Sequence, residues 1–296
     1  MTHEARALYV ERDGVRLHVV EEGNRKGPLV VFVHGYPDDL RVWDGVVAQL
    51  KDEFHILRYD VRGAGLSDTP QAVQEYRLQE LSEDLVAVVD EVAPDKAFHV
   101  VGHDWGSIQL WESVTDSSLR GRIRSFVSAS GPSIDFVSMQ NRAAWQSREP
   151  RKILRSLNQA MRSWYVMMFQ LPVLPELAWT RRGTKMFEKR AAAVEKVPFA
   201  VFHDENRARN GRSGIALYRA NMLQRMGAPE PRRSDVPTKV LVVSGDPYVS
   251  ETIAYSCKDW MSEVEFQVVP GGHWFYLAQP ELFAEPVRAF VRAHAE

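Results

Sequence analysis

The chain has 296 residues, of which 45% are hydrophobic and 26% are charged, a composition typical of a globular protein with a large buried core. A net charge of −2 excludes a general polyanion-binding protein, so we expect no nucleic-acid partner. The single cysteine, Cys257, excludes a disulfide framework and is typical of a reducing, cytoplasmic environment. Because no basic-then-apolar leader and no run of about 18 apolar residues occur, we expect neither secretion nor stable membrane insertion.

Predicted strands and helices alternate along the chain. Two β-branched runs around Asp13-Gly14 predict an N-terminal hairpin. A helical pattern covers 77–92, and continuous apolar runs predict strands buried on both faces at 28–35, 54–60, 97–104, 123–131, 238–246 and 264–272. This order favours an α/β fold with a mostly parallel sheet.

The segment 133–235 differs from the rest because it contains helices and loops without a clear strand. It carries 19 basic and 9 acidic residues, whereas the remainder carries 18 and 30, so the two parts have net charges of +10 and −12. We therefore predict a core of 1–132 and 236–296 and an inserted helical cap at 133–235. The basic cap either docks on the acidic core, which we favour, or faces an acidic partner or anionic lipid. A homodimer stays open.

A sharp turn is predicted at Gly102-His103-Asp104-Trp105-Gly106, where a strand is followed by a helix. Small residues on both sides allow the central side chain, Asp104, to project above the sheet edge. A carboxylate is ionised at neutral pH and needs no base to activate it. Its attack on a saturated carbon with a leaving group gives a stable alkyl ester, so epoxides and alkyl halides are the substrates that this residue type favours.

Two further residues follow predicted strands in the order expected of a nucleophile, an acid and a histidine. Asp246 follows VLVVSG and His273 follows EFQVVPGG. Each alone is explained as a turn aspartate or a loop histidine, but the ordered trio predicts a catalytic site at the carboxyl ends of the strands. His103, beside the nucleophile, is expected to be a packed histidine.

The chain resembles α/β-hydrolase-fold epoxide hydrolases in the segments VFVHGYPDDLRVWD, YDVRGAGLSD, VGHDWGS, SGDPYV and GGHWFYLAQPE. It is most similar to the hydrolase half of certain actinobacterial proteins fused to a short-chain dehydrogenase. The resemblance implies an eight-stranded sheet with a helical cap. It also implies an oxyanion hole formed by the backbone N–H groups of Tyr36 and Trp105.

The resemblance also implies two ring-opening tyrosines in the cap. Tyr165 precedes Gln170 by five residues, and Tyr218 lies in a Tyr-Arg-x-Asn-like context. A phenol can hold and protonate the oxygen of an opening epoxide. The apolar run 157–179 is expected to be mostly core between cap and sheet, with some side chains lining a substrate tunnel.

Two other functions remain open beside an epoxide hydrolase that acts on a small, lipophilic epoxide. A haloalkane dehalogenase would use the same aspartate, although such enzymes often carry Asn at the position of Tyr36. Some place the acid after the sixth strand, where Asp135 is the candidate. A non-catalytic ligand-binding protein is the third possibility. The histidine spacing indicates no metal site, and we expect no cofactor.

Overall fold

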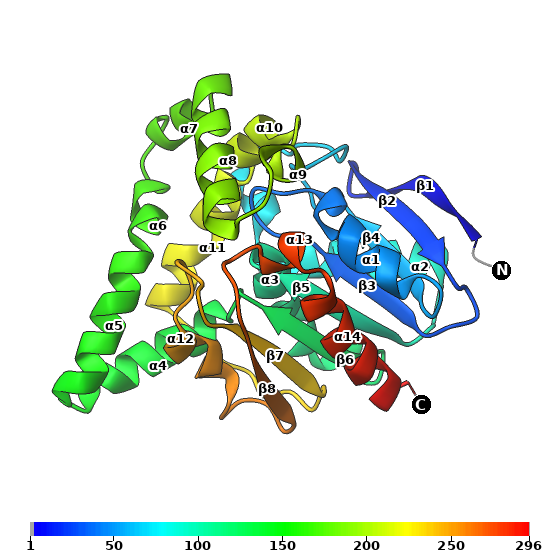
Figure 1. Cartoon of the computed structure of the whole chain (residues 1–296). Coiled ribbons are helices and arrows are strands. Elements are labelled where there is room, and N and C mark those ends of the chain that lie inside the picture. The colour runs from blue at the N-terminus through cyan, green and yellow to red at the C-terminus, as the bar shows by residue number, and fades with distance from the viewer. Residues whose placement is uncertain (1–2, 296) are drawn as a thin grey trace.

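The computed structural model describes residues 3–295 and contains a central sheet of eight strands (Figure 1). The strand order is β1-β2-β4-β3-β5-β6-β7-β8. The pairs β1–β2 and β2–β4 are antiparallel, and every other neighbouring pair is parallel. The predicted α/β fold with a mostly parallel sheet is confirmed. The strands are β1 (His3–Arg12), β2 (Val15–Gly23), β3 (Leu29–Val33), β4 (His55–Tyr59), β5 (Phe98–His103), β6 (Ile123–Ala129), β7 (Thr238–Val243) and β8 (Val264–Val269).

The N-terminal hairpin forms as its turn residues predict. Asp13 and Gly14 have φ values of +49° and +77°, the left-handed conformation that a two-residue hairpin turn requires. The hairpin pairs with β4 through β2, so it extends the parallel part of the sheet by two antiparallel strands.

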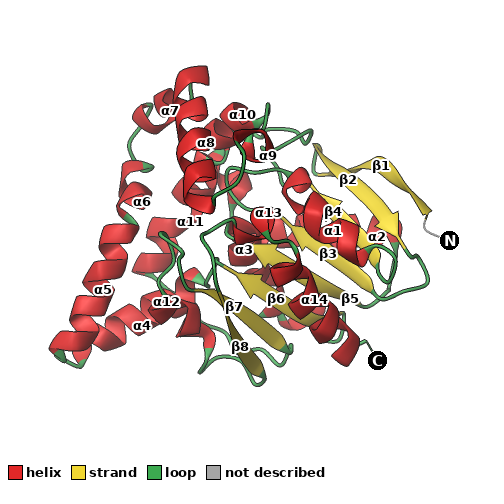
Figure 2. Ribbon diagram, in the orientation of Figure 1, coloured by secondary structure: helices red, strands yellow, loops and turns green. Residues whose placement is uncertain are grey.

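Helices cover both faces of the sheet (Figure 2). Successive residues of β3 point to opposite faces. Val31 and Val33 join one hydrophobic cluster with α2 (Leu78–Val92) and α3 (Trp105–Val114), and Val30 and Phe32 join another with α1 (Asp44–Leu50) and α14 (Glu281–Ala293). Strands buried on both faces therefore read as unbroken apolar runs. The elements are η1 (Leu40–Trp43), α1 (Asp44–Leu50), η2 (Val73–Tyr76), α2 (Leu78–Val92), α3 (Trp105–Val114), η3 (Ser117–Leu119), α12 (Glu251–Ala254), η4 (Tyr255–Cys257), α13 (Phe275–Ala278) and α14 (Glu281–Ala293).

Helices α4 to α11 lie between β6 and β7 in the chain, and we call them the inserted helices. A third hydrophobic cluster joins α6 and α11 to the first residues of α2 and α3, so the inserted helices cover the carboxyl ends of the strands. They are α4 (Ile134–Gln146), α5 (Pro150–Arg162), α6 (Trp164–Met168), α7 (Leu174–Ala178), α8 (Arg181–Glu195), α9 (Phe199–Phe202), α10 (Arg207–Ser213) and α11 (Ile215–Gly227).

The expectation that 157–179 is mostly core is wrong for much of this run. Phe169 and Trp179 are buried, but Met161, Trp164 and Met167 are 67%, 64% and 57% exposed. The sequence shows the apolar side of a helix but not the direction in which that side points. Among residues 3–295, no helix is both long and apolar enough to cross a lipid bilayer.

Candidate active site

Asp104 occupies a strained turn between β5 and α3. Its φ of +52° and ψ of −124° are rarely adopted by a residue with a side chain, and such strain is typical of functional positions. Two close approaches enforce the turn. A Cβ on Gly106 would lie 2.0 Å from the carbonyl oxygen of Val33, and a Cβ on Gly35 would lie 2.5 Å from the Cβ of Asp104. Only glycine fits at both positions, so the backbone presents the Asp104 carboxylate above the sheet.

The predicted nucleophile, acid and histidine lie together. His273 Nδ1 is 2.9 Å from Asp246 Oδ2, and His273 Nε2 is 3.6 Å from Asp104 Oδ2. The Asp246 and His273 side chains are buried, whereas the Asp104 side chain is 13% exposed. The imidazole thus lies between two carboxylates, of which one can be reached from outside.

The charges of Asp104 and Asp246 control the protonation of the His273 imidazole. Burial alone would lower the pKa of His273, but the charge of Asp246 and the adjoining Asp104 raise it to about 10. Burial would likewise raise the pKa of Asp246, but the charge and hydrogen bond of His273 lower it. The backbone N–H groups of Tyr248 and Val249 donate to Asp246 Oδ1 at 2.7 and 3.0 Å and fix its orientation. In the free protein His273 is therefore an imidazolium.

His103 packs behind the catalytic histidine. Its Nε2 lies 2.8 Å from the carbonyl oxygen of His273, and its Nδ1 lies 3.1 Å from the Tyr276 hydroxyl. A carbonyl only accepts, so Nε2–H donates and Nδ1 accepts from the phenol. Burial, together with the charge of His273, lowers the pKa of His103 to about 3. This neutral ring holds the backbone of His273.

Of the two predicted oxyanion donors, one contacts the Asp104 carboxylate and the other follows Asp104 in the chain. The Tyr36 N–H donates to Asp104 Oδ1 at 2.7 Å. Trp105 is the first residue of α3, where a backbone N–H has no partner within the helix. The Tyr36 hydroxyl points away and donates to the carbonyl oxygen of Gly211 at 2.8 Å. Its ring, not its hydroxyl, therefore faces the site.

Tyr165 and Tyr218 belong to a group of contacting rings with Trp105 and Tyr248, which we call the aromatic roof. The Tyr218 ring lies 4.9 Å from that of Trp105 and 5.9 Å from that of Tyr165, centroid to centroid. Tyr165 contacts the Tyr248 ring at 5.8 Å, which in turn contacts His273 at 4.9 Å. Burial raises the pKa of Tyr165, and the charge of Asp104 raises it further; for Tyr218 burial, Tyr165 and then Asp104 act in the same direction. Both phenols are therefore protonated, and the charge of Asp104 raises the pKa of each.

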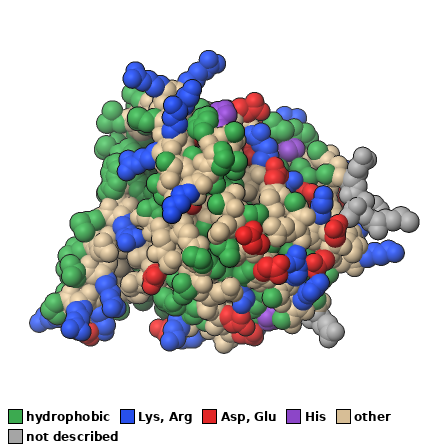
Figure 3. All heavy atoms as spheres, in the orientation of Figure 1, with side chains coloured by type: hydrophobic (Ala, Val, Ile, Leu, Met, Phe, Trp, Pro, Cys, Tyr) green, Lys and Arg blue, Asp and Glu red, His purple; other side chains and the backbone are tan. Residues whose placement is uncertain are grey.

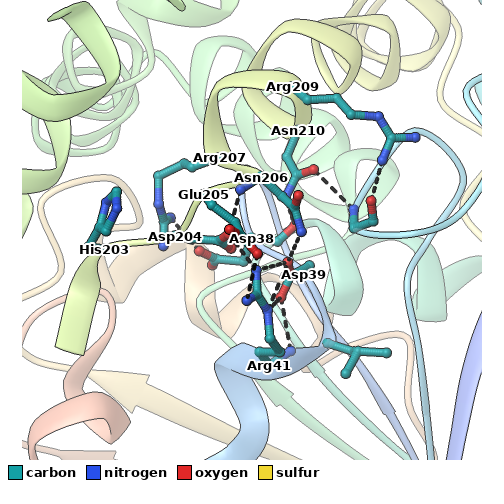
Figure 4. Close-up of polar contacts among 12 residues, drawn as sticks. Asp38, Asp39, Arg41, His203, Asp204, Glu205, Asn206, Arg207, Arg209 and Asn210 are labelled. Carbon is teal, nitrogen blue, oxygen red and sulfur yellow. Dashed lines mark hydrogen bonds and ion pairs between the residues drawn. The ribbon is translucent and has the colours of Figure 1, made fainter. Parts of the chain in front are cut away.

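Several residues that support this site were missed by the sequence analysis. Trp274 Nε1, next to His273, donates to Asp38 Oδ2 at 2.8 Å, and Arg207 of α10 donates to Asp38 Oδ1 at 2.6 Å. Figure 4 shows Asp38 among side chains of α10 and of the loop that precedes it. The carboxylate of Glu195, at the end of α8, lies against Gly272, and burial raises the pKa of Glu195. Nothing in the spacing of these residues along the chain links them.

The alternative acid lies elsewhere. Asp135 is in the first turn of α4, where Arg225 of α11 donates to its Oδ2 at 3.2 Å. The backbone N–H of Glu230 donates to its Oδ1 at 2.9 Å. Asp135 thus fixes α4 against α11, and Asp246 is the carboxylate that contacts His273.

Comparison with known proteins identifies the family of this chain. The family model described as "Alpha/beta hydrolase family" matches residues 30–285, so the chain belongs to the alpha/beta hydrolase family. A Mycobacterium tuberculosis protein named "probable oxidoreductase EphD" is 34% identical over 98% of this chain and 50% of its own length. Epoxide hydrolase 1 of Caenorhabditis elegans is 26% identical over 97% of this chain and 70% of its own length.

Solved structures share the fold. The epoxide hydrolase of Bacillus megaterium, in complex with an inhibitor, superposes with a TM-score of 0.78 at 18% identity and covers 96% of this chain and all of its own. Epoxide hydrolase A of Mycobacterium thermoresistibile gives a TM-score of 0.73 at 22% identity, covering 98% of both chains. The chain spans about half the length of the EphD protein, in keeping with the expected resemblance to one half of a fused protein.

Proposed function

We propose that this chain is an epoxide hydrolase that converts a lipophilic epoxide to a vicinal diol. The observation that carries the proposal is the Asp104 carboxylate on its strained turn, 3.6 Å from His273 Nε2, together with the partly buried Tyr165 and the buried Tyr218, whose pKa values the Asp104 charge helps to raise. The relatives named as epoxide hydrolases support it. The helices between β6 and β7 act as the cap of the site.

In the first step, the hydroxyls of Tyr165 and Tyr218 hold the epoxide oxygen, and a carboxylate oxygen of Asp104 attacks a ring carbon. The C–O bond of the ring breaks, an alkyl ester forms, and one phenol gives its proton to the departing oxygen. Alkylation removes the charge of Asp104. Because that charge helps to keep His273 protonated, the imidazolium can now return a proton to the phenolate.

In the second step, neutral His273 takes a proton from water, and the resulting hydroxide adds to the ester carbonyl. The backbone N–H groups of Tyr36 and Trp105 stabilise the oxyanion. Collapse of this intermediate breaks the bond between the carboxyl carbon and the alkyl oxygen, and the departing alkoxide takes the proton of the added hydroxyl group, so that the diol leaves. Asp104 is again a carboxylate and His273 is again an imidazolium, so the cycle consumes one epoxide and one water.

Assays of styrene oxide and 1-bromobutane, side by side, test the proposal. We expect diol from the epoxide and no bromide from the haloalkane, because Tyr36 stands where a second halide donor is needed and its hydroxyl is bound to Gly211. The Asp104→Asn variant is the control and should form no diol. Bromide release would establish the dehalogenase instead. Failure of both assays across a panel of epoxides of increasing size would favour a ligand-binding protein.

A further inference from the structure

Helix α5 presents its apolar side to solvent. Leu154, Leu157 and Met161 follow one another at intervals of three and four residues, which places them on one side of a helix. Their exposed fractions are 66%, 44% and 67%. A helix of a globular protein normally buries this side, so α5 has the reverse orientation.

Polar contacts fix this orientation. Gln159 Nε2 donates to the carbonyl oxygen of Tyr248 at 2.8 Å, and Arg162 Nη1 donates to the carbonyl oxygen of Asp246 at 2.8 Å. Both acceptors belong to the loop that carries the acid of the candidate active site. The polar side of α5 is thus the side that binds the protein, and rotation of the helix to bury its apolar side would break these bonds.

The exposed apolar surface continues over α6 and α7. Trp164 and Met167 of α6 and Leu174 of α7 are 64%, 57% and 61% exposed. Together with the three exposed residues of α5 they form what we call the α5–α7 face. Figure 3 shows hydrophobic side chains gathered along the edge of the molecule that these helices form. An exposed apolar surface of this kind marks an interaction site.

Basic residues border the α5–α7 face. Arg148, Arg151, Lys152 and Arg155 are exposed at the start of α5 or just before it. The whole segment 133–235 has 19 basic against 9 acidic residues. Figure 3 shows Lys and Arg side chains near both ends of the apolar edge. This positive charge would oppose pairing of the face with the same face of a second copy, and it would attract an anionic surface.

We propose that the α5–α7 face binds the surface of an anionic lipid membrane. Apolar side chains that include Trp, with Lys and Arg beside them, are the features of helices that lie in the headgroup region. The hydrocarbon groups enter the acyl boundary while the basic groups contact lipid phosphates. Tyr165, on the same short helix as Trp164 and Met167, faces the candidate active site, so the membrane lies directly behind the aromatic roof.

Vesicle sedimentation of the full chain tests this proposal. The probes are vesicles of phosphatidylcholine alone and vesicles with about 30% phosphatidylglycerol, at about 0.1 M salt. We expect the protein to bind the anionic vesicles at least ~10-fold more strongly and to be released as salt rises. The double variant Leu154→Glu/Met161→Glu should lose at least ~10-fold of this affinity, because charged groups do not enter the acyl boundary.

A matched control keeps the test specific. The double variant Leu66→Glu/Val268→Glu adds the same charge at two exposed positions outside 133–235, whose exposed fractions are 57% and 58%. It should bind vesicles nearly as the unaltered chain does. Far-ultraviolet circular dichroism verifies that all variants fold. The proposal is overturned if the unaltered chain stays in the supernatant, or if Leu154→Glu/Met161→Glu binds no worse than the control. A dimer that this variant dissociates, without vesicle binding by the unaltered chain, would assign the face to a second copy.

Discussion

His273 lies between Asp104 and Asp246, and its protonation follows the charges of both. With both carboxylates ionised, its pKa is about 10, so the free protein holds an imidazolium. An imidazolium cannot accept a proton from water. The proposed mechanism therefore requires the first step to lower the pKa of His273, which loss of the Asp104 charge does.

A pH experiment tests this dependence. Below its pKa His273 is protonated and inactive as a base, so the rate of ester hydrolysis should rise with pH. The midpoint of that rise should lie below about 10, because Asp246 alone raises the pKa of His273 in the ester state. Single-turnover hydrolysis rates give the midpoint in the ester state, and imidazole NMR shifts give it in the free protein. Equal midpoints would show that Asp104 does not control His273.

The phenols should act in the first step only. Replacement of Tyr165 or Tyr218 by Phe keeps the ring contacts of the aromatic roof but removes the hydroxyl that protonates the epoxide oxygen. We expect the rate of ester formation to fall by ~10²-fold or more for at least one variant, with ester hydrolysis nearly unchanged. Rapid-quench single turnovers separate the two rates. Tyr255→Phe, at a partly exposed tyrosine that contacts Phe266, is the matched control.

If Tyr255→Phe slowed ester formation equally, or if Tyr165→Phe and Tyr218→Phe slowed only ester hydrolysis, the two phenols would have no role in ring opening.

At the scale of residues, the sequence predicts the positions of those side chains that follow directly from the order of the strands along the chain. The proximity of Asp104, Asp246 and His273 could be predicted because each follows a strand of one parallel sheet, whose carboxyl ends meet at one edge. Tyr165 and Tyr218 were predicted only from the resemblance to epoxide hydrolases, because helical spacing does not reveal which side of a helix faces the sheet. Their rings contact those of Trp105 and Tyr248, and their role remains a prediction.

At the scale of elements, α10 is held to the core by a buried ion pair. Arg207 lies 2.6 Å from Asp38 Oδ1 and 3.2 Å from Glu188 Oε1, and all three side chains are at most 5% exposed. Asp38 also accepts from the indole of Trp274. The contact thus connects an inserted helix to the loop of the candidate catalytic histidine, so its loss should affect both stability and turnover.

Replacement of Arg207 by Met should lower the free energy of unfolding by about 3–5 kcal/mol, because two buried carboxylates lose their cation. Urea unfolding measures the change. The control is Arg120→Met, which breaks a pair with Asp235 in which both side chains are more than 60% exposed. Its effect on the free energy of unfolding should be much smaller, because water and salt screen an exposed pair. Similar losses in the two variants would contradict the importance of the buried pair.

The sequence predicted the strands better than the inserted helices. Apolar runs such as 28–35 identify buried strands because both faces of the sheet are covered. In α5, by contrast, the pattern of Leu154, Leu157 and Met161 identifies a helix side but not its environment. Hydrogen bonds from Gln159 and Arg162 to a loop more than 80 residues away decide that orientation.

At the scale of the whole molecule, the candidate site is built from two parts of the chain, the strands of the sheet and the inserted helices. Asp104, Asp246 and His273 follow strands or their connecting turns, whereas Tyr165 and Tyr218 come from inserted helices. The difference in charge between 133–235 and the rest of the chain was visible in the composition. The sequence alone did not show that this segment also exposes an apolar side, because long-range contacts determine how each helix is turned.

The most direct test of the covalent mechanism is a single turnover in ¹⁸O-labelled water with enzyme in excess over epoxide. If Asp104 forms an ester that water cleaves at the carboxyl carbon, the label enters the Asp104 carboxylate, and the first diol carries none. Mass spectrometry of the diol and of the peptide that contains Asp104 reads both outcomes. Label found entirely in the first diol, with an unlabelled peptide, would mean that water attacks the epoxide directly and would contradict the mechanism.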